Sequence, residues 1–337
     1  DTEIEPKSQK ILDIGSVKGD GNTFHSNSIT DFITFLSGTE FICGHNILNH
    51  DLKYIQKVVD GAGIRPSKVI DTLFLSPLLF PTTPYHALVK DDKLQTEDSN
   101  NPLNDSIKAK DLFFDEVAAF QQADEVLKQI LYVLLNDKRE FHSFFRFIAY
   151  TSTETNLEKL IREKFHSETC EHADLTKIIS EHPVELAYSL VLINCRNRYS
   201  ITPPWVLKNY PETERVMIAL RNKPCLLGCV YCNQALDIHK GLKTYFGFNA
   251  YRTYGGEQLL ESAVKAAVNN KSLLAVFPTG GGKSITFQVP ALMSGIATKG
   301  LTVIISPLQS LMKDQVDNLE KIGIIDAVTI NGLLDPI

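Results

Sequence analysis

The stretch FPTGGGKSITFQVP, residues 277–290, places three consecutive glycines before a lysine and a hydroxyl side chain. It follows the apolar run 272–277 and leads into a second apolar segment, which is the strand, loop, helix order of a phosphate-binding loop. Backbone N–H groups freed by glycine bind anions at a helix N-terminus, Lys283 would reach the β and γ phosphates of ATP, and Ser284 would help hold Mg²⁺. The predicted nucleotide-binding residues are Thr279, Gly280, Gly281, Gly282, Lys283 and Ser284.

The residues around this loop predict the elements that position it. A helical pattern spans residues 258–268, and the apolar runs SLLAVF (272–277) and LTVIIS (301–306) are each followed by a further helical pattern. Alternating strands and helices are typical of a parallel sheet with helices on its faces. We therefore expect 272–277 and 301–306 to be buried strands of an α/β lobe.

Three stretches together resemble the first motifs of RecQ-family ATP-dependent DNA helicases: FGFNAYRTY (246–254), the glycine-rich loop and LTVIISPLQSLMKDQVDNL (301–319). The resemblance covers residues 246–337. It implies a RecA-like lobe, 3′ to 5′ unwinding, single-stranded and duplex DNA as partners, DNA contacts from residues 306–315, and a role in DNA repair or recombination. In that family an adenine-reading Gln closely follows an aromatic-Arg pair; Arg252 belongs to that pair here, and the nearest candidate for the Gln is Gln258, six residues later.

The same resemblance implies parts that do not occur before Ile337. An acidic box that binds magnesium and a second RecA-like lobe should follow the 306–315 segment. We therefore expect this chain to be a fragment of a longer bacterial protein, cut at both ends, that binds ATP but does not hydrolyse it or unwind DNA alone.

Acidic residues at the other end of the chain form a second candidate site. Asp1 and Glu3 alternate along a predicted strand, so both would face one side of it. With GHNILNHD (44–51) and NPLND (101–105), they resemble the ordered motifs of DEDD 3′ to 5′ exonucleases, which implies a ribonuclease-H-like α/β domain. In that family four carboxylates hold two Mg²⁺ ions, one activating water and one stabilising the leaving oxygen. The matching residues here are Asp1, Glu3, Asp51 and Asp105.

The family's general base has no match at the expected positions. A His five residues or a Tyr four residues before the last Asp would be expected, and Asn100 and Asn101 stand there. His86, five residues before Asp91, is the candidate base, and a packing or solvent-facing role for it stays open. A domain without the base would only position DNA for the motor, which is the alternative function.

Three cysteines in RNKPCLLGCVYC have the spacing of metal ligands. Cys225, Cys229 and Cys232 form a C-x₃-C-x₂-C pattern, and a fourth ligand must come from elsewhere. Zn²⁺ is expected, with a four-cysteine 4Fe–4S cluster or a radical enzyme with an open iron as alternatives. The candidates for the fourth ligand are Cys170, as first choice, and His172, Cys195 and His239.

Composition bounds these interpretations. The formal net charge is −6, and residues 1–140 alone carry −8, so the chain lacks the basic excess of a passive nucleic-acid binder. No run of 18 or more apolar residues occurs, which predicts a cytoplasmic, nucleoid-associated protein without a membrane span.

The two resemblances, the cysteine cluster and the hydrophobic periodicity together imply four segments. They are the exonuclease-like domain (1–137), a mainly helical connector (138–221), the cysteine segment (222–245) and the partial RecQ-like lobe (246–337). Within the first, the predicted elements are strands 10–17 and 40–46, helices 28–38 and 50–63, a strand and turn at 68–81, and one long helix at 106–137.

Overall fold

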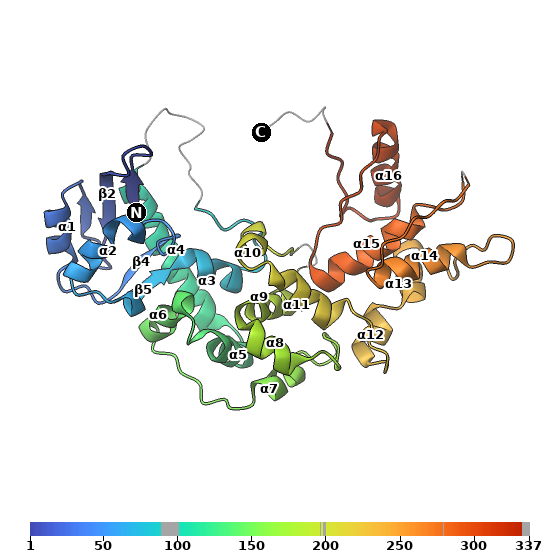
Figure 1. Cartoon of the computed structure of the whole chain (residues 1–337), viewed down its shortest axis with the longest axis horizontal. Coiled ribbons are helices and arrows are strands. Elements are labelled where there is room, and N and C mark those ends of the chain that lie inside the picture. Colours follow the sequence, from blue (N-terminus) through green and yellow to red (C-terminus); the bar gives the residue numbers. More distant parts are fainter. Residues whose placement is uncertain (89–100, 196, 198–199, 279, 332–337) are drawn as a thin grey trace. The chain divides into compact units, whose positions relative to one another are not determined.

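The computed structural model describes residues 1–88, 101–195, 197, 200–278 and 280–331. The chain is a mixed α/β protein that divides into two compact units (Figure 1). The first comprises Asp1–Lys164, Leu175–Cys195 and Pro203–Thr213, and the second comprises Phe165–Asp174, Arg196–Thr202 and Glu214–Ile337. Among the described residues, no helix has the length and apolar character needed to cross a membrane.

The strands of the first unit form two small sheets. Strands β1 (Thr2–Ile4), β2 (Ile11–Val17) and β3 (Thr23–His25) are antiparallel in the order β1-β2-β3. Strands β4 (Ile42–Gly44) and β5 (Val69–Asp71) are parallel and bring Cys43 opposite Ile70. The strands predicted at 10–17 and 40–46 are confirmed.

Two amphipathic helices and a long one complete this part. Helices α1 (Ile29–Leu36) and α2 (Leu52–Gly61) bury one apolar face each, as predicted, and form a core with Ile14 and Val69. Helix α4 (Pro102–Gln122) packs closely on β2. A Cβ at Gly15 would lie 2.0 Å from the backbone nitrogen of Leu103, so a side chain there would push the helix away.

The prediction of one long helix at 106–137 was wrong. Helix α4 ends at Gln122, and α5 (Glu125–Leu135) begins after it. Asp124 causes the break because its side chain accepts a hydrogen bond from the Leu127 N–H at 3.0 Å and so caps a new helix.

The strand and turn predicted at 68–81 were only partly right. After β5 the chain forms helix α3 (Thr72–Leu79), capped by Asp71, whose carboxylate accepts from the Leu73 N–H at 3.0 Å. Residues 72–78 are all buried. A segment buried on every side shows no helical periodicity, which is why its pattern resembled a strand.

The remaining helices of the first unit pack around aromatic side chains. Phe74 of α3 contacts Trp205 edge-on, with ring centroids 5.0 Å apart, and its carbonyl accepts from the Tyr188 hydroxyl at 2.9 Å. These contacts join α3 to segments more than 100 residues later. The helices are α6 (Arg139–Phe147), α7 (Leu157–Lys164), α8 (Leu175–Glu181), α9 (Pro183–Asn194) and α10 (Pro204–Asn209), with a 3₁₀ turn η1 (Pro66–Lys68) before β5.

The second unit is helical in the residues described. Helices α13 and α14 both pack on α15 (Figure 1), and Met293 of α15 approaches Gly241 of α13 so closely that a Cβ there would lie 2.6 Å from its sulfur. The helices are α11 (Glu212–Arg221), α12 (Val230–Ala235), α13 (Ile238–Phe246), α14 (Leu259–Val268), α15 (Ile285–Thr298) and α16 (Gln309–Lys321).

The two buried strands predicted for this unit were wrong. Residues 272–277 and 301–306 have no strand assignment, and no described residue pairs with them in a sheet. Leu274 is 92% exposed and Ile305 is 91% exposed. A strand needs a neighbour for its backbone hydrogen bonds, so an apolar run without one stays extended and exposed.

Candidate functional site

The glycine-rich loop precedes helix α15, as its sequence predicts. Gly280 and Gly282 both have a φ of +75°, a conformation that favours glycine. Ser284 directly precedes the helix, and its side chain makes no capping bond. The ammonium of Lys283 donates to the Phe277 carbonyl at 3.3 Å, so the lysine side chain folds back toward the residues that precede the glycines. Thr279 lies outside the described residues.

Tyr254 and Arg252 hold this loop from the preceding segment. The Tyr254 hydroxyl donates to the Gly281 carbonyl, and the Arg252 guanidinium donates to the Gly280 carbonyl at 3.3 Å. The Arg252 guanidinium also lies 5.9 Å from the centre of the Tyr254 ring. Tyr254 was missed as a site residue, although it stands in the stretch FGFNAYRTY. Gln258 is exposed at the residue before α14.

The predicted DNA-contacting segment is linked to the same helix. The Gln288 side chain, in the second turn of α15, donates to the Gln315 side chain at 2.8 Å. Gln315 belongs to α16, which carries much of the 306–315 segment. A direct contact therefore joins the helix behind the glycine-rich loop to the segment expected to contact DNA.

Hydrogen bonds draw the three acidic segments of the first unit together. The Thr2 N–H and hydroxyl both donate to the same carboxylate oxygen of Asp51, at 2.8 Å each. The Ser106 hydroxyl donates to the Gly15 carbonyl at 2.6 Å, and the Asp1 nitrogen donates to the Ser106 hydroxyl at 2.9 Å. Strand β1 with Asp1 and Glu3, the start of α2 with Asp51, and the first turn of α4 with Asp105 are thus neighbours.

Asp51 is buried, whereas Asp1 is exposed and Glu3 and Asp105 are half-buried. Burial pushes the pKa of Asp51 upward, but hydrogen bonds from His50 and Thr2 outweigh it and leave the pKa below its ordinary value. Asp51 is therefore ionised at neutral pH. Among the described residues, these carboxylates do not form a cluster of three or more ligand atoms as tight as that of the cysteines.

The prediction missed Asp71, which positions the GHN loop. Its buried carboxylate accepts from the Asn46 N–H at 2.8 Å and the Leu48 N–H at 3.0 Å. Burial raises its pKa to about 6, although these N–H groups favour the ionised form. An Asp that ends an apolar run just before a helix is a cap signal, which could have identified it from the sequence.

Two histidines of the first unit bond to residues of helix α3: half-buried His45, which belongs to the GHN loop, and buried His86. His86, the candidate base, is bonded through Nδ1 to the Ser76 hydroxyl at 2.8 Å, and His45 through Nδ1 to Thr72 at 2.9 Å. Neither Nε2 has a hydrogen-bond partner among the residues that the structure describes. Burial lowers the pKa of each ring to about 4. His86 is thus neutral at pH 7, and a conjugate acid of such low pKa makes it a weak base.

Asn101 occupies one of the two expected base positions. Asn101 caps α4 by accepting from the Leu103 N–H at 3.0 Å, which is a structural role. Asn100 and Asp91 lie outside the described residues.

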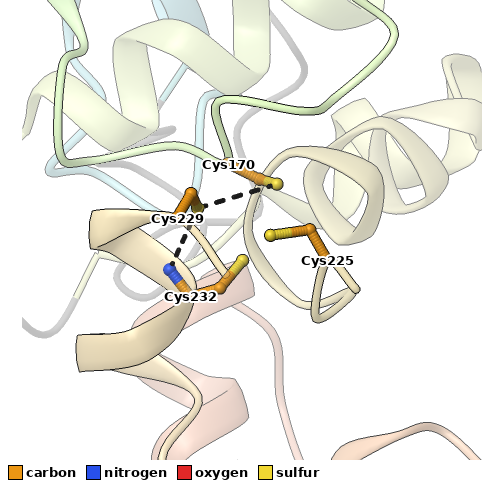
Figure 2. Close-up of side chains that lie close together, drawn as sticks. All are labelled: Cys170, Cys225, Cys229 and Cys232. Carbon is orange, nitrogen blue, oxygen red and sulfur yellow. Dashed lines mark hydrogen bonds between the residues drawn. The ribbon is translucent and has the colours of Figure 1, made fainter. Parts of the chain in front are cut away.

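Four cysteine side chains converge in the second unit. Cys225, Cys229 and Cys232 are joined by Cys170, and one ligand atom from each lies within 4.8 Å of the others (Figure 2). Cys229 is the residue before α12, and its sulfur accepts from the Cys232 N–H at 3.3 Å. Among the other candidates for the fourth ligand, His172, Cys195 and His239 are not in the group.

Comparisons with known proteins match the C-terminal part of the chain. The DEAD/DEAH box helicase family matches residues 259–334. The chain is 47% identical over 91 residues to the ATP-dependent DNA helicase RecQ of Bacillus subtilis, covering 27% of this chain and 14% of that protein. It is 47% identical over 83 residues to the RecQ helicase of Haemophilus influenzae, covering 25% and 12%. Over 62 residues it is 47% identical to the helicase hus2/rqh1 of Schizosaccharomyces pombe, covering 18% and 5%.

These matches bear on a limited region. The chain spans about one seventh of the length of the B. subtilis relative. No solved structure matches the chain. The similarity to DNA helicases of the RecQ type therefore concerns the lobe that contains the glycine-rich loop.

Proposed function

We propose that this chain is part of an ATP-dependent DNA helicase of the RecQ type and that its glycine-rich loop binds ATP with Mg²⁺. The observation that carries the proposal is the loop itself, with its two left-handed glycines, Lys283 and the start of α15 in sequence order. The helicase-family match over residues 259–334 and the names of the relatives support the same activity.

The loop residues have distinct roles in this proposal. When ATP binds, Lys283 exchanges its hydrogen bond to the Phe277 carbonyl, a neutral acceptor, for stronger bonds to the negatively charged phosphates. The Ser284 hydroxyl, which makes no capping bond, supplies an oxygen ligand of the kind Mg²⁺ prefers. Arg252 and Tyr254 hold the loop carbonyls and thereby orient its N–H groups toward the anion. The Gln288–Gln315 bond carries nucleotide-dependent movement of α15 to the segment expected to contact DNA.

Titration of the chain with ATP and Mg²⁺ by calorimetry tests this function. Lys283→Ala should weaken ATP binding about 10- to 100-fold because it removes a charged hydrogen bond of about 1.5–3 kcal/mol. Lys271→Ala, an exposed lysine outside the loop, is the matched control and should bind as the unaltered chain does. Equal ATP affinity in all three proteins would disprove nucleotide binding at this loop.

A second candidate function is 3′ to 5′ exonuclease activity in the first unit. The hydrogen bonds that join Thr2 to Asp51, and Asp1 and Gly15 to Ser106, support it because they gather the segments of all three acidic motifs. Asp1, Glu3, Asp51 and Asp105 would hold two Mg²⁺ ions, since carboxylate oxygens suit that ion. Such ions would supply an activated water and charge stabilisation of the leaving oxygen.

Digestion of a 3′-labelled single-stranded DNA in the presence of Mg²⁺ tests this second function. Asp51→Asn should abolish digestion, and Asp31→Asn, which changes an exposed carboxylate in α1, should not. DNA binding without digestion by the unaltered chain would instead support the alternative of a domain that only positions DNA for the motor.

A further inference from the structure

The four-cysteine group is the tightest arrangement of metal-ligating side chains among the described residues. Cys170 comes from the loop between α7 and α8, and the other three from a twelve-residue stretch that ends in α12. Figure 2 shows the four side chains pointing toward one another. The Cys229 and Cys170 sulfurs are 3.9 Å apart, far beyond the length of about 2 Å of a disulfide.

We propose that Cys170, Cys225, Cys229 and Cys232 form a closed site for a single Zn²⁺ ion. Four sulfurs that share one ion at about 2.3 Å in tetrahedral geometry are separated by about 3.8 Å. The 3.9 Å between two of the sulfurs, and the limit of 4.8 Å for the whole group, agree with one shared ion. The proposal is independent of the nucleotide and exonuclease sites because it concerns other residues and another ligand.

The same distances argue against the iron-sulfur alternatives. A 4Fe–4S cluster binds each cysteine to a different iron and spreads the sulfurs to roughly 6 Å from one another. A radical enzyme needs three cysteines and one open iron position, but here a fourth thiol completes the set. Both alternatives therefore require the four side chains to move apart.

The backbone around the site favours sulfur ligands. Gly228, with a φ of +69°, turns the chain so that Cys229 can begin α12, and the Cys232 N–H then donates to the Cys229 sulfur. Such N–H groups orient a metal-bound thiolate and offset its charge. On the opposite segment, the Cys170 N–H donates to the Leu220 carbonyl at 2.8 Å and holds Cys170 beside the end of α11.

The loop between Cys225 and Cys229 has little apolar packing of its own, which favours a structural role for the metal. Leu226 is fully exposed and Leu227 is 78% exposed, so the residues between Cys225 and Cys229 bury little apolar surface. Helix α12 has only six residues, too few to be stable by itself. A bound Zn²⁺ would fasten residues 222–235 to residues 165–174 and keep both in place within the second unit.

Metal analysis of the full chain, purified under reducing conditions, tests the proposal. We expect one zinc per chain, no inorganic sulfide, and after replacement by Co²⁺ an absorption spectrum typical of four sulfur ligands around one tetrahedral ion. A brown protein with iron and inorganic sulfide, a chain without bound metal, or a Co²⁺ spectrum of fewer than four sulfurs would overturn it.

Two serine variants test the ligand assignment. Cys170→Ser should weaken zinc retention against a chelator by at least about tenfold, because loss of a direct ligand exceeds the effect of losing an outer one. Cys195→Ser, which changes a cysteine outside the group, should retain zinc as the unaltered chain does. The reverse result would refute Cys170 as the fourth ligand. Cys225→Ser gives an independent check if Cys170→Ser does not fold.

Discussion

Short apolar runs behave differently in the two units. In the first unit, β4 and β5 pair in parallel, and Val69 and Ile70 are almost completely buried. In the second, the runs 272–277 and 301–306 are as apolar but have no partner among the described residues, and they expose Leu274 and Ile305. An apolar run predicts a strand only where another segment supplies the hydrogen bonds and the covering surface.

The largest expected effect is the difference between truncating a side chain in a paired apolar run and truncating one in an unpaired run. Ile70→Ala should lower the free energy of unfolding of the first unit by about 2–5 kcal/mol, because it leaves a cavity in a packed core. Leu274→Ala should change stability by no more than about 0.5 kcal/mol, because its side chain is already in solvent. Urea denaturation followed by circular dichroism measures both. A large loss for Leu274→Ala would mean that 272–277 is a buried strand after all.

A somewhat smaller effect is expected where β2 meets α4. Gly15→Ala should destabilise the first unit by about 1–3 kcal/mol, because its Cβ would overlap the backbone of Leu103 and displace the turn that carries Asp105. Gly19→Ala is the matched control, since its Cβ would meet no atom within 4 Å. Thermal unfolding distinguishes them, and equal melting temperatures would contradict the close approach of α4.

The first unit should also respond to acid through His45 and His86. Their pKa values are lowered by burial to about 4, so the folded state binds fewer protons than the unfolded state. Stability is then complete above pH 6.5 and is lost as the pH falls toward 4. His86→Gln should reduce this loss. Unfolding curves between pH 4 and 7 measure the difference.

The smallest expected effect has the opposite sign and concerns Glu116. Neither oxygen of its buried carboxyl has a hydrogen-bond partner within the described part of the chain, and burial with the nearby charge of Asp71 raises its pKa well above the ordinary value. The folded state therefore binds the extra proton, and stability falls as the pH rises above about 4.5. Glu116→Gln should remove this decline. A pH profile identical to that of the unaltered chain would show that Glu116 is ionised without cost.

Local signals in the sequence predicted much of the first unit. The helices predicted at 28–38 and 50–63 correspond to α1 and α2. The sequence did not show which residues are buried by, or bonded to, distant parts of the chain. Helix α3 is covered on all sides, so its period was hidden, and Asp71 acts on a loop more than 20 residues earlier.

In the candidate sites, too, continuous motifs were predicted from the sequence, whereas most contacts between distant residues were not. The glycine-rich loop is a continuous motif, so the order of loop and helix could be predicted directly from the sequence. The hydrogen bond from the Tyr254 hydroxyl to the Gly281 carbonyl was missed because it joins residues 27 positions apart. The spacing of Cys225, Cys229 and Cys232 indicated a metal site, and Cys170 was the first choice for the fourth ligand, with His172, Cys195 and His239 as the other candidates. The fold brings Cys170 to the group from more than 50 residues away.

Hydrogen exchange of the full chain with and without ATP and Mg²⁺ shows whether the glycine-rich loop binds the nucleotide, because it follows both units in one measurement. We expect slower exchange at residues 280–288, where the glycine-rich loop meets α15, and no change in β1, β4 or the start of α4. Unchanged exchange at residues 280–288 with ATP present, or protection confined to the first unit, would contradict this expectation.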